Sequence, residues 1–267
     1  MKKILFITAT RIGDAVLSTG ILHALCNKYP HSAITVACGP LVAELFAACP
    51  QVHRVIPLKK QPYAGHWRQL WGQVVLTRWD MVVDLRNSVV SRLVLSGHTY
   101  VFGPSVPAHL HKVEQYAHLM GLTPPPAPHL WVDAKTAAQA AALMAGGGPI
   151  LAVGPTANWT TKTWPADRFI TVIQKLTGAG GPIQGARVAA LAAESERSQA
   201  APVLAALPPD RTINLVGVGG PLLAAACLKH ARLFVGHDSG LSHMAAAMGT
   251  PTLALFGPSW PHIYRPW

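Results

Sequence analysis

Short apolar runs alternate with segments of helical periodicity along almost the whole chain, and this alternation constrains the fold more than any other feature. The runs carry few polar residues on either face, which is typical of strands buried in a parallel sheet. Parallel strands joined by helices form doubly wound α/β sheets. The predicted strands are residues 4–9, 33–37, 52–57, 81–85, 150–153, 187–191, 212–215, 231–235 and 252–256. The predicted helices are residues 15–29, 41–48, 67–78, 109–121, 134–145, 166–177, 194–207, 221–230 and 241–248.

The length of 267 residues leaves room for two such domains. A glycine run followed by proline, Gly146-Gly147-Gly148-Pro149, marks the expected boundary, so we predict Rossmann-like domains over 1–147 and 148–267. Ligands of such sheets bind beyond the carboxyl ends of the strands, and a cleft between the two domains is the expected site. Only a loop follows the last predicted strand, whereas a second half of this kind normally finishes with further helices. We therefore expect the C-terminal domain to be truncated.

The chain is strongly basic, with 22 Lys and Arg against 11 Asp and Glu and a formal charge of +11. This charge favours an anionic partner such as a nucleotide, a nucleic acid or an acidic membrane surface, although an ordinary basic enzyme would show it too. The four cysteines have no C-x-x-C spacing and lie in apolar surroundings, as buried thiols of a reducing compartment do. No apolar window is long enough for a transmembrane helix, and the N-terminal run is too short for a signal peptide. We expect a cytoplasmic protein.

The segment 231–256 reads as a strand, a loop, a helix and a second strand. The loop lies at the N-terminus of the helix, where unpaired N–H groups and the helix dipole favour an anion. Asp238 and Ser239 are also good helix-capping residues, so a phosphate site and a plain capped helix both remain open here.

Two other turns carry candidate residues. Asp14, which follows Arg11 and Gly13 at the start of the first helix, is either a favourable acid at a helix start or a general base. Lys162 precedes a helix start, an unfavourable place for a cation unless an anion compensates it, though it could equally be a solvated loop lysine. Thr156 and Asn158 could donate hydrogen bonds to the same anion.

Carboxylates also follow the strand at 187–191. Glu194 or Glu196 would suit a ribose diol, as in other nucleotide-binding α/β folds, or simply favour the helix start. His237, Asp238 and His243 raise the alternative of a His-Asp metal phosphohydrolase, but no further ligand cluster has recognisable spacing. The sequence contains no Gly-x-Ser-x-Gly elbow and no P-loop.

Four motifs resemble those of glycosyltransferase family 9, the heptosyltransferases of lipopolysaccharide core assembly. They fall in the family's order: Arg11-Ile12-Gly13-Asp14-Ala15-Val16-Leu17-Ser18, His111-Lys112-Val113-Glu114-Gln115-Tyr116, Lys162-Thr163-Trp164-Pro165, and Asp238-Ser239-Gly240-Leu241-Ser242-His243 with Gly249-Thr250-Pro251. Two features depart from the family: Ala192-Ala193 replaces its more usual Gly-rich turn, and its C-terminal helices are missing.

The resemblance implies a GT-B fold and an inverting transfer of a heptose or related sugar from a nucleotide-sugar, usually ADP-heptose, to the lipid A–core acceptor. Asp14 would be the catalytic base, and Lys162 would bear on the diphosphate above the amides of Ser239, Gly240 and Leu241. Asp238 would hold the donor sugar, and Glu194 or Glu196 the ribose. The donor would be a co-substrate, with no metal, other cofactor or nucleic-acid partner, and the protein would work at the anionic inner membrane. A relative that binds the nucleotide-sugar without turnover is the main alternative.

Overall fold

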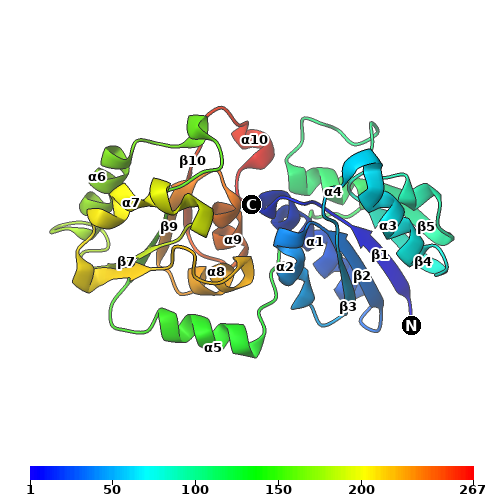
Figure 1. Cartoon of the computed structure of the whole chain (residues 1–267), viewed down its shortest axis with the longest axis horizontal. Helices are drawn as coiled ribbons and strands as arrows, with labels where there is room; N and C mark the ends of the chain where they lie inside the picture. The colour runs from blue at the N-terminus through cyan, green and yellow to red at the C-terminus, as the bar shows by residue number, and fades with distance from the viewer. The chain divides into compact units, whose positions relative to one another are not determined.

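The structure, a computed structural model, describes all 267 residues apart from the side chain of Thr160. The chain divides into two compact units, one of Met1–Trp131 with Trp267 and one of Val132–Pro266. Each unit contains a five-stranded sheet in which every pair of neighbouring strands is parallel. The predicted architecture of two Rossmann-like units is therefore confirmed (Figure 1).

The first unit has the strand order β3-β2-β1-β4-β5. Its strands and helices are β1 (Lys3–Ile7), α1 (Ile12–Lys28), β2 (Ala33–Cys38), α2 (Ala43–Ala47), β3 (Val52–Pro57), α3 (Gly65–Val74), β4 (Trp79–Asp84), β5 (Ser96–Val101) and α4 (Lys112–Met120), with 3-10 turns η1 (Pro40–Val42), η2 (Pro62–Ala64) and η3 (Val90–Arg92).

The core of the first unit covers both faces of its sheet. On one face Leu5 and Ile7 of β1 are fully buried in a cluster with Leu70 and Val74 of α3. Alternate residues of a strand point to opposite faces, and Phe6 accordingly meets Phe46 of α2, with ring centroids 6.4 Å apart. This burial on both sides explains why β1 is apolar at every position from Ile4 to Ile7.

The second unit has the strand order β10-β9-β6-β7-β8. Its strands and helices are α5 (Ala134–Leu143), β6 (Ile150–Gly154), α6 (Ala166–Thr177), β7 (Arg187–Ala190), α7 (Arg197–Ala205), β8 (Thr212–Asn214), α8 (Pro221–Leu228), β9 (Leu233–His237), α9 (Gly240–Ala247), β10 (Thr252–Leu255) and α10 (Pro261–Tyr264), with 3-10 turns η4 (Thr160–Lys162), η5 (Glu194–Glu196) and η6 (Pro209–Arg211).

Helices also cover the sheet of the second unit on both faces. Phe169 and Ile173 of α6 pack with Val203 of α7 against the β6 residues Leu151 and Val153. Helices α8 and α9 contact each other, and α5 packs on α8 (Figure 1). The hydroxyl of Thr250 donates to the Leu228 carbonyl at 2.7 Å, which fixes the end of α9 against the end of α8.

Three features differ from the sequence expectations. The edge strand β5 was not predicted, because its residues Ser-Gly-His-Thr-Tyr-Val lack the apolar pattern of a buried strand. The short helix α10 follows the last strand, where only a loop was expected. The compact units divide after Trp131 rather than at the glycine run, because α5 packs on α8 and thus lies in the second unit. None of the helices described is both long and apolar enough to cross a membrane.

Candidate functional site

Three neighbouring strands of the second sheet end at the same edge and carry most of the predicted residues there. Strands β9, β6 and β7 are adjacent in the sheet. Asp238 follows β9, Thr156 follows β6, and the turn η5 with its two glutamates follows β7. Parallel order therefore brings segments far apart in sequence to one carboxyl edge, where α/β sheets bind ligands.

Lys162 and Asp238 form an ion pair at this edge. Lys162 Nζ lies 2.5 Å from Asp238 Oδ2, and the two side chains are only 17% and 7% exposed. The other carboxylate oxygen of Asp238 lies 3.9 Å from Nε2 of the buried His243. The predicted loop lysine is thus a partly buried cation whose position is set by a carboxylate from another strand.

Helix α9 begins immediately beside this pair. Ser239 is its N-cap residue, and the Ser239 N–H donates to Ser242 Oγ at 3.4 Å. The buried Ser239 hydroxyl has no hydrogen-bond partner among the described groups. The first N–H groups of a helix have no partner within the helix, so those of Gly240 and Leu241 can donate to an anion.

Two glycines of the second sheet leave room for the Phe234 ring. A Cβ added to Gly154 would lie 2.9 Å from the Phe234 ring and 3.2 Å from Leu241. One added to Gly236 would lie 2.6 Å from the same ring. Real Cβ atoms essentially never come within 3.0 Å of another atom, so a side chain at either position would require the buried Phe234 ring to shift.

His237 has a different role from the metal ligand considered in the sequence. The Trp164 N–H donates to His237 Nε2 at 2.9 Å, so this nitrogen carries no proton. The other nitrogen, Nδ1, lies 3.4 Å from the Thr156 carbonyl. Burial lowers the pKa of His237 below its ordinary 6.5 and keeps the imidazole neutral. The ring therefore connects β6 to the segment that carries Lys162.

Glu196 belongs to a hydrogen-bonded network at the end of β6. The buried Thr156 hydroxyl donates to Glu196 Oε2 at 2.6 Å. Gln199 accepts from the Ala157 N–H at 3.2 Å and donates to the Thr163 hydroxyl at 2.8 Å. Sequence reasoning missed Gln199, because nothing in its helical context marks it as a site residue. The network fixes both ends of the segment 157–163, within which Lys162 lies.

Glu194 lies outside this network. Its carboxylate is 66% exposed and accepts two hydrogen bonds from Arg197, at 2.8 Å from Nε and 2.6 Å from an Nη. These bonds hold the pKa of Glu194 below its ordinary value. Arg197 also donates to the Val216 carbonyl at 2.9 Å, and a Cβ on Gly217 would overlap the carboxylate. Arg197 thus fixes the orientation of the Glu194 side chain, which stays exposed to solvent. The Glu196 carboxylate instead accepts the hydrogen bond from Thr156.

Asp14 lies in the first unit, in the first turn of α1. The exposed Arg11 is the N-cap residue of this helix, and its side chain makes no capping hydrogen bond. Gly13, just before Asp14, is partly buried. Asp14 is itself partly buried, and among the described groups none donates a hydrogen bond to its carboxylate. An acid with this exposure at the carboxyl edge of β1 can accept a proton from a bound hydroxyl.

Lys112 of α4 faces the same region and was not assigned a role from the sequence. Its ammonium donates to Gln115 Oε1 at 3.1 Å and lies 4.3 Å from the Phe102 ring centroid. Burial lowers the pKa of Lys112, and the negative charge of Asp14 partly offsets this effect. His111 caps α4 by accepting from the Val113 N–H at 3.2 Å. The motif at residues 111–116 therefore forms the start of α4 and places the Lys112 ammonium near Asp14.

Two further observations bear on the predicted residues. Asn158 is exposed and lies in the turn after β6. The described residues include no group of three or more His, Cys, Asp or Glu side chains that could hold a metal ion.

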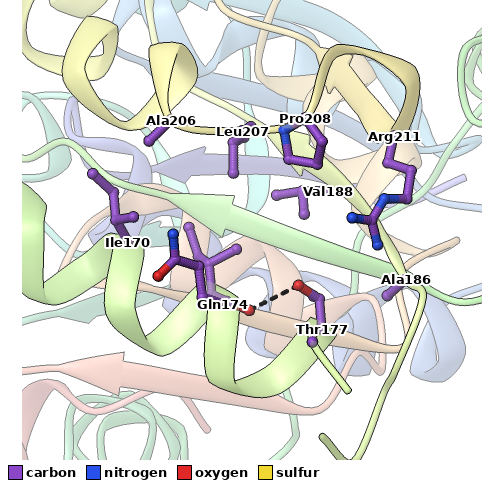
Figure 2. Close-up of a pocket in the computed structure, with 11 residues that line it drawn as sticks. Ile170, Gln174, Thr177, Ala186, Val188, Ala206, Leu207, Pro208 and Arg211 are labelled. Atoms are coloured by element: carbon purple, nitrogen blue, oxygen red, sulfur yellow. Dashed lines mark hydrogen bonds between the residues drawn. The ribbon is translucent and has the colours of Figure 1, made fainter.

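A separate pocket lies at the opposite edge of the second sheet (Figure 2). It has a volume of about 230 Å³ and lies between the C-terminal half of α6, the start of β7 and the segment 206–211. Figure 2 shows apolar side chains such as Ile170 and Leu207 around it, with Arg211 at one end. None of the predicted site residues lines this pocket.

Comparisons with known proteins agree with the motifs. Lipopolysaccharide heptosyltransferase 2 of Salmonella typhimurium is 25% identical over 305 residues, which span 99% of this chain and 85% of that protein. Lipopolysaccharide heptosyltransferase 3 of Escherichia coli is 33% identical over 120 residues, which span 43% of this chain and 33% of that protein.

Solved structures share the fold. A glycosyl transferase family 9 protein from Veillonella parvula has a TM-score of 0.80 at 19% identity, over 100% of this chain and 84% of that chain. The E. coli ADP-heptose lps heptosyltransferase II has a TM-score of 0.78 at 24% identity, over 100% of this chain and 88% of that chain. The family model of glycosyltransferase family 9 (heptosyltransferase) matches residues 99–267, well over half of the sequence. The chain therefore belongs to glycosyltransferase family 9, the heptosyltransferases.

Proposed function

We propose that this protein transfers a heptose from ADP-heptose to the lipid A–core oligosaccharide of lipopolysaccharide, with inversion at the anomeric carbon. The observation that carries the proposal is the Lys162–Asp238 pair beside the start of α9. A cation next to unpaired helix N–H groups is a site for a diphosphate. Related proteins support the identity of the donor, since one solved relative is described as E. coli heptosyltransferase WaaC with ADP and another contains ADP-2-deoxy-2-fluoro heptose.

In this proposal the second unit binds the donor. The diphosphate lies over the N–H groups of Ser239, Gly240 and Leu241, and Lys162 neutralises the charge that develops as ADP leaves. The protein supplies this positive charge itself, so we propose that transfer needs no metal or other cofactor. Glu194, held by Arg197, accepts hydrogen bonds from the ribose hydroxyls, and Glu196 fixes Thr156 beneath the site. Asp238 orients Lys162 and contacts the donor sugar.

The first unit binds the acceptor and supplies the base. The acceptor hydroxyl oxygen attacks the anomeric carbon, and the bond from that carbon to ADP breaks. The Asp14 carboxylate takes the proton that the hydroxyl loses. Lys112 places a positive charge near the carboxylate before the proton arrives. We propose a cytoplasmic protein that contacts the inner face of the inner membrane, where a lipid-anchored acceptor would be presented.

A donor screen tests this proposal. The protein is incubated with ADP-heptose, other ADP-sugars and UDP-sugars, with and without core lipid and in the presence of EDTA, and nucleotide release is measured. We expect ADP release from ADP-heptose only with acceptor, undiminished by EDTA, and a loss of about 10²–10⁴-fold in Asp14→Asn. Donor binding without release, at any acceptor concentration, would instead identify a binding protein without turnover. Asp14→Asn with full activity would refute the assigned base.

A further inference from the structure

A group of large apolar side chains lies exposed on the first unit, away from the residues assigned to catalysis. Leu76, Leu95, Leu93 and Trp71 are 97%, 70%, 54% and 41% exposed, and we refer to these four residues as the Trp71 patch. Single exposed leucines are common on protein surfaces and need no explanation. Contiguous apolar patches with a polar rim mark interaction surfaces.

Hydrogen bonds bring the segments that carry these residues next to one another. The indole N–H of Trp71, on α3, donates to the Leu93 carbonyl at 3.1 Å. The backbone N–H of Trp79 donates to the Leu95 carbonyl at 2.9 Å. This bond places Leu95 beside the loop that carries Leu76. Trp67, one helical turn before Trp71, packs on the core together with Val94. Trp71 thus lies on α3, and the three leucines lie in the two loops that precede β4 and β5.

The surroundings of the patch are basic. Arg68, Arg78 and Arg92 are exposed next to its members in the sequence. Arg92 is held by its hydrogen bonds to the Ser88 carbonyl at 3.0 Å and Asn87 Oδ1 at 2.7 Å. Residues 65–96 contain four arginines and two acids, of which Asp84 is fully buried and Asp80 is exposed, so positive charge is in excess at the surface of this segment.

We propose that the Trp71 patch docks on the surface of an anionic lipid bilayer. Leucine and the indole of tryptophan enter the boundary between headgroups and acyl chains, while neighbouring arginines meet anionic headgroups. The same positive charges disfavour a second copy of this chain as the occupant, because two basic rims would repel each other. This proposal rests on the proposed function in one respect: docking on a membrane brings the protein to its acceptor only if that acceptor is anchored in the bilayer.

Vesicle co-sedimentation tests the patch directly. The variant is Leu76→Glu/Leu95→Glu, two exposed positions whose change leaves the core intact, and circular dichroism checks the fold. The matched control is Leu253→Glu, a leucine of the second unit that is 49% exposed. On vesicles of phosphatidylcholine mixed with phosphatidylglycerol we expect the variant to partition about tenfold more weakly than wild type, with the control unchanged. Binding should fall with added salt and on vesicles of phosphatidylcholine alone.

Three outcomes would overturn the proposal: no wild-type binding to anionic vesicles, equal binding by the variant, or a wild-type dimer in light scattering that the variant abolishes. Donor turnover separates this result from the proposed function. With acceptor dispersed in detergent, the variant should release ADP at the wild-type rate, while on acceptor embedded in anionic vesicles its rate should fall about tenfold. A protein that binds vesicles through the patch but never releases ADP would refute the proposed function alone.

Discussion

The ammonium of Lys162 lies 2.5 Å from Oδ2 of Asp238, and the carboxylate is only 7% exposed. This pair joins η4 to the end of β9 across 76 residues of sequence. A buried pair contributes little net stability, but removing one partner leaves an uncompensated charge.

The first prediction concerns the stability of this pair. Lys162→Met should lower the free energy of unfolding by about 3 kcal/mol, because the Asp238 carboxylate loses its counter-ion. The double variant Lys162→Met/Asp238→Asn should recover most of that loss, because no buried charge remains. Urea unfolding of wild type, both single variants and the double variant measures the coupling. A loss in the double variant equal to the sum of the two single-variant losses would show that the two residues act independently.

The second prediction concerns the hydroxyl of Ser239. Replacing an N-cap serine by alanine usually costs about 1 kcal/mol. Here the buried hydroxyl has no described partner, so Ser239→Ala should leave the unliganded protein as stable as wild type, or more so. The same variant should weaken ADP binding, because the hydroxyl is then lost as a donor. Thermal unfolding with and without ADP measures both effects, and a clear loss of stability without ligand would contradict the prediction.

The third prediction concerns pH. The pKa of His237 is lowered by burial from its ordinary 6.5, so below that pH the unfolded chain binds a proton that the folded chain does not. The folded state should therefore lose stability as pH falls below 6.5, at no more than about 1.4 kcal/mol per pH unit from this group. In His237→Asn this contribution disappears. Unfolding free energies of both proteins across this range test it, and parallel curves would count against a neutral His237.

Much of this arrangement could be predicted from the sequence, because apolar runs that alternate with helices indicate strands of a parallel sheet. Lys162 and Asp238 follow such runs, and parallel strands must end at a common edge. The partners of each glutamate could not be predicted: the two residues are separated by Ser195 alone, yet one pairs with Arg197 and the other with Thr156. Their directions depend on how η5 turns into α7, which no periodicity specifies. The edge strand β5 could not be predicted either, because its exposed residues lack the apolar pattern of a buried strand.

If Lys162 recognises the diphosphate, its replacement should weaken the binding of ADP but not that of AMP. Isothermal titration calorimetry measures the Kd of each nucleotide for wild type and for Lys162→Met. We expect Lys162→Met to bind ADP at least about tenfold more weakly, as for a lost hydrogen bond to a charged group, and to bind AMP as wild type does. The AMP result also controls for any loss of fold. An ADP affinity that Lys162→Met leaves unchanged would contradict the role of Lys162 in binding the diphosphate.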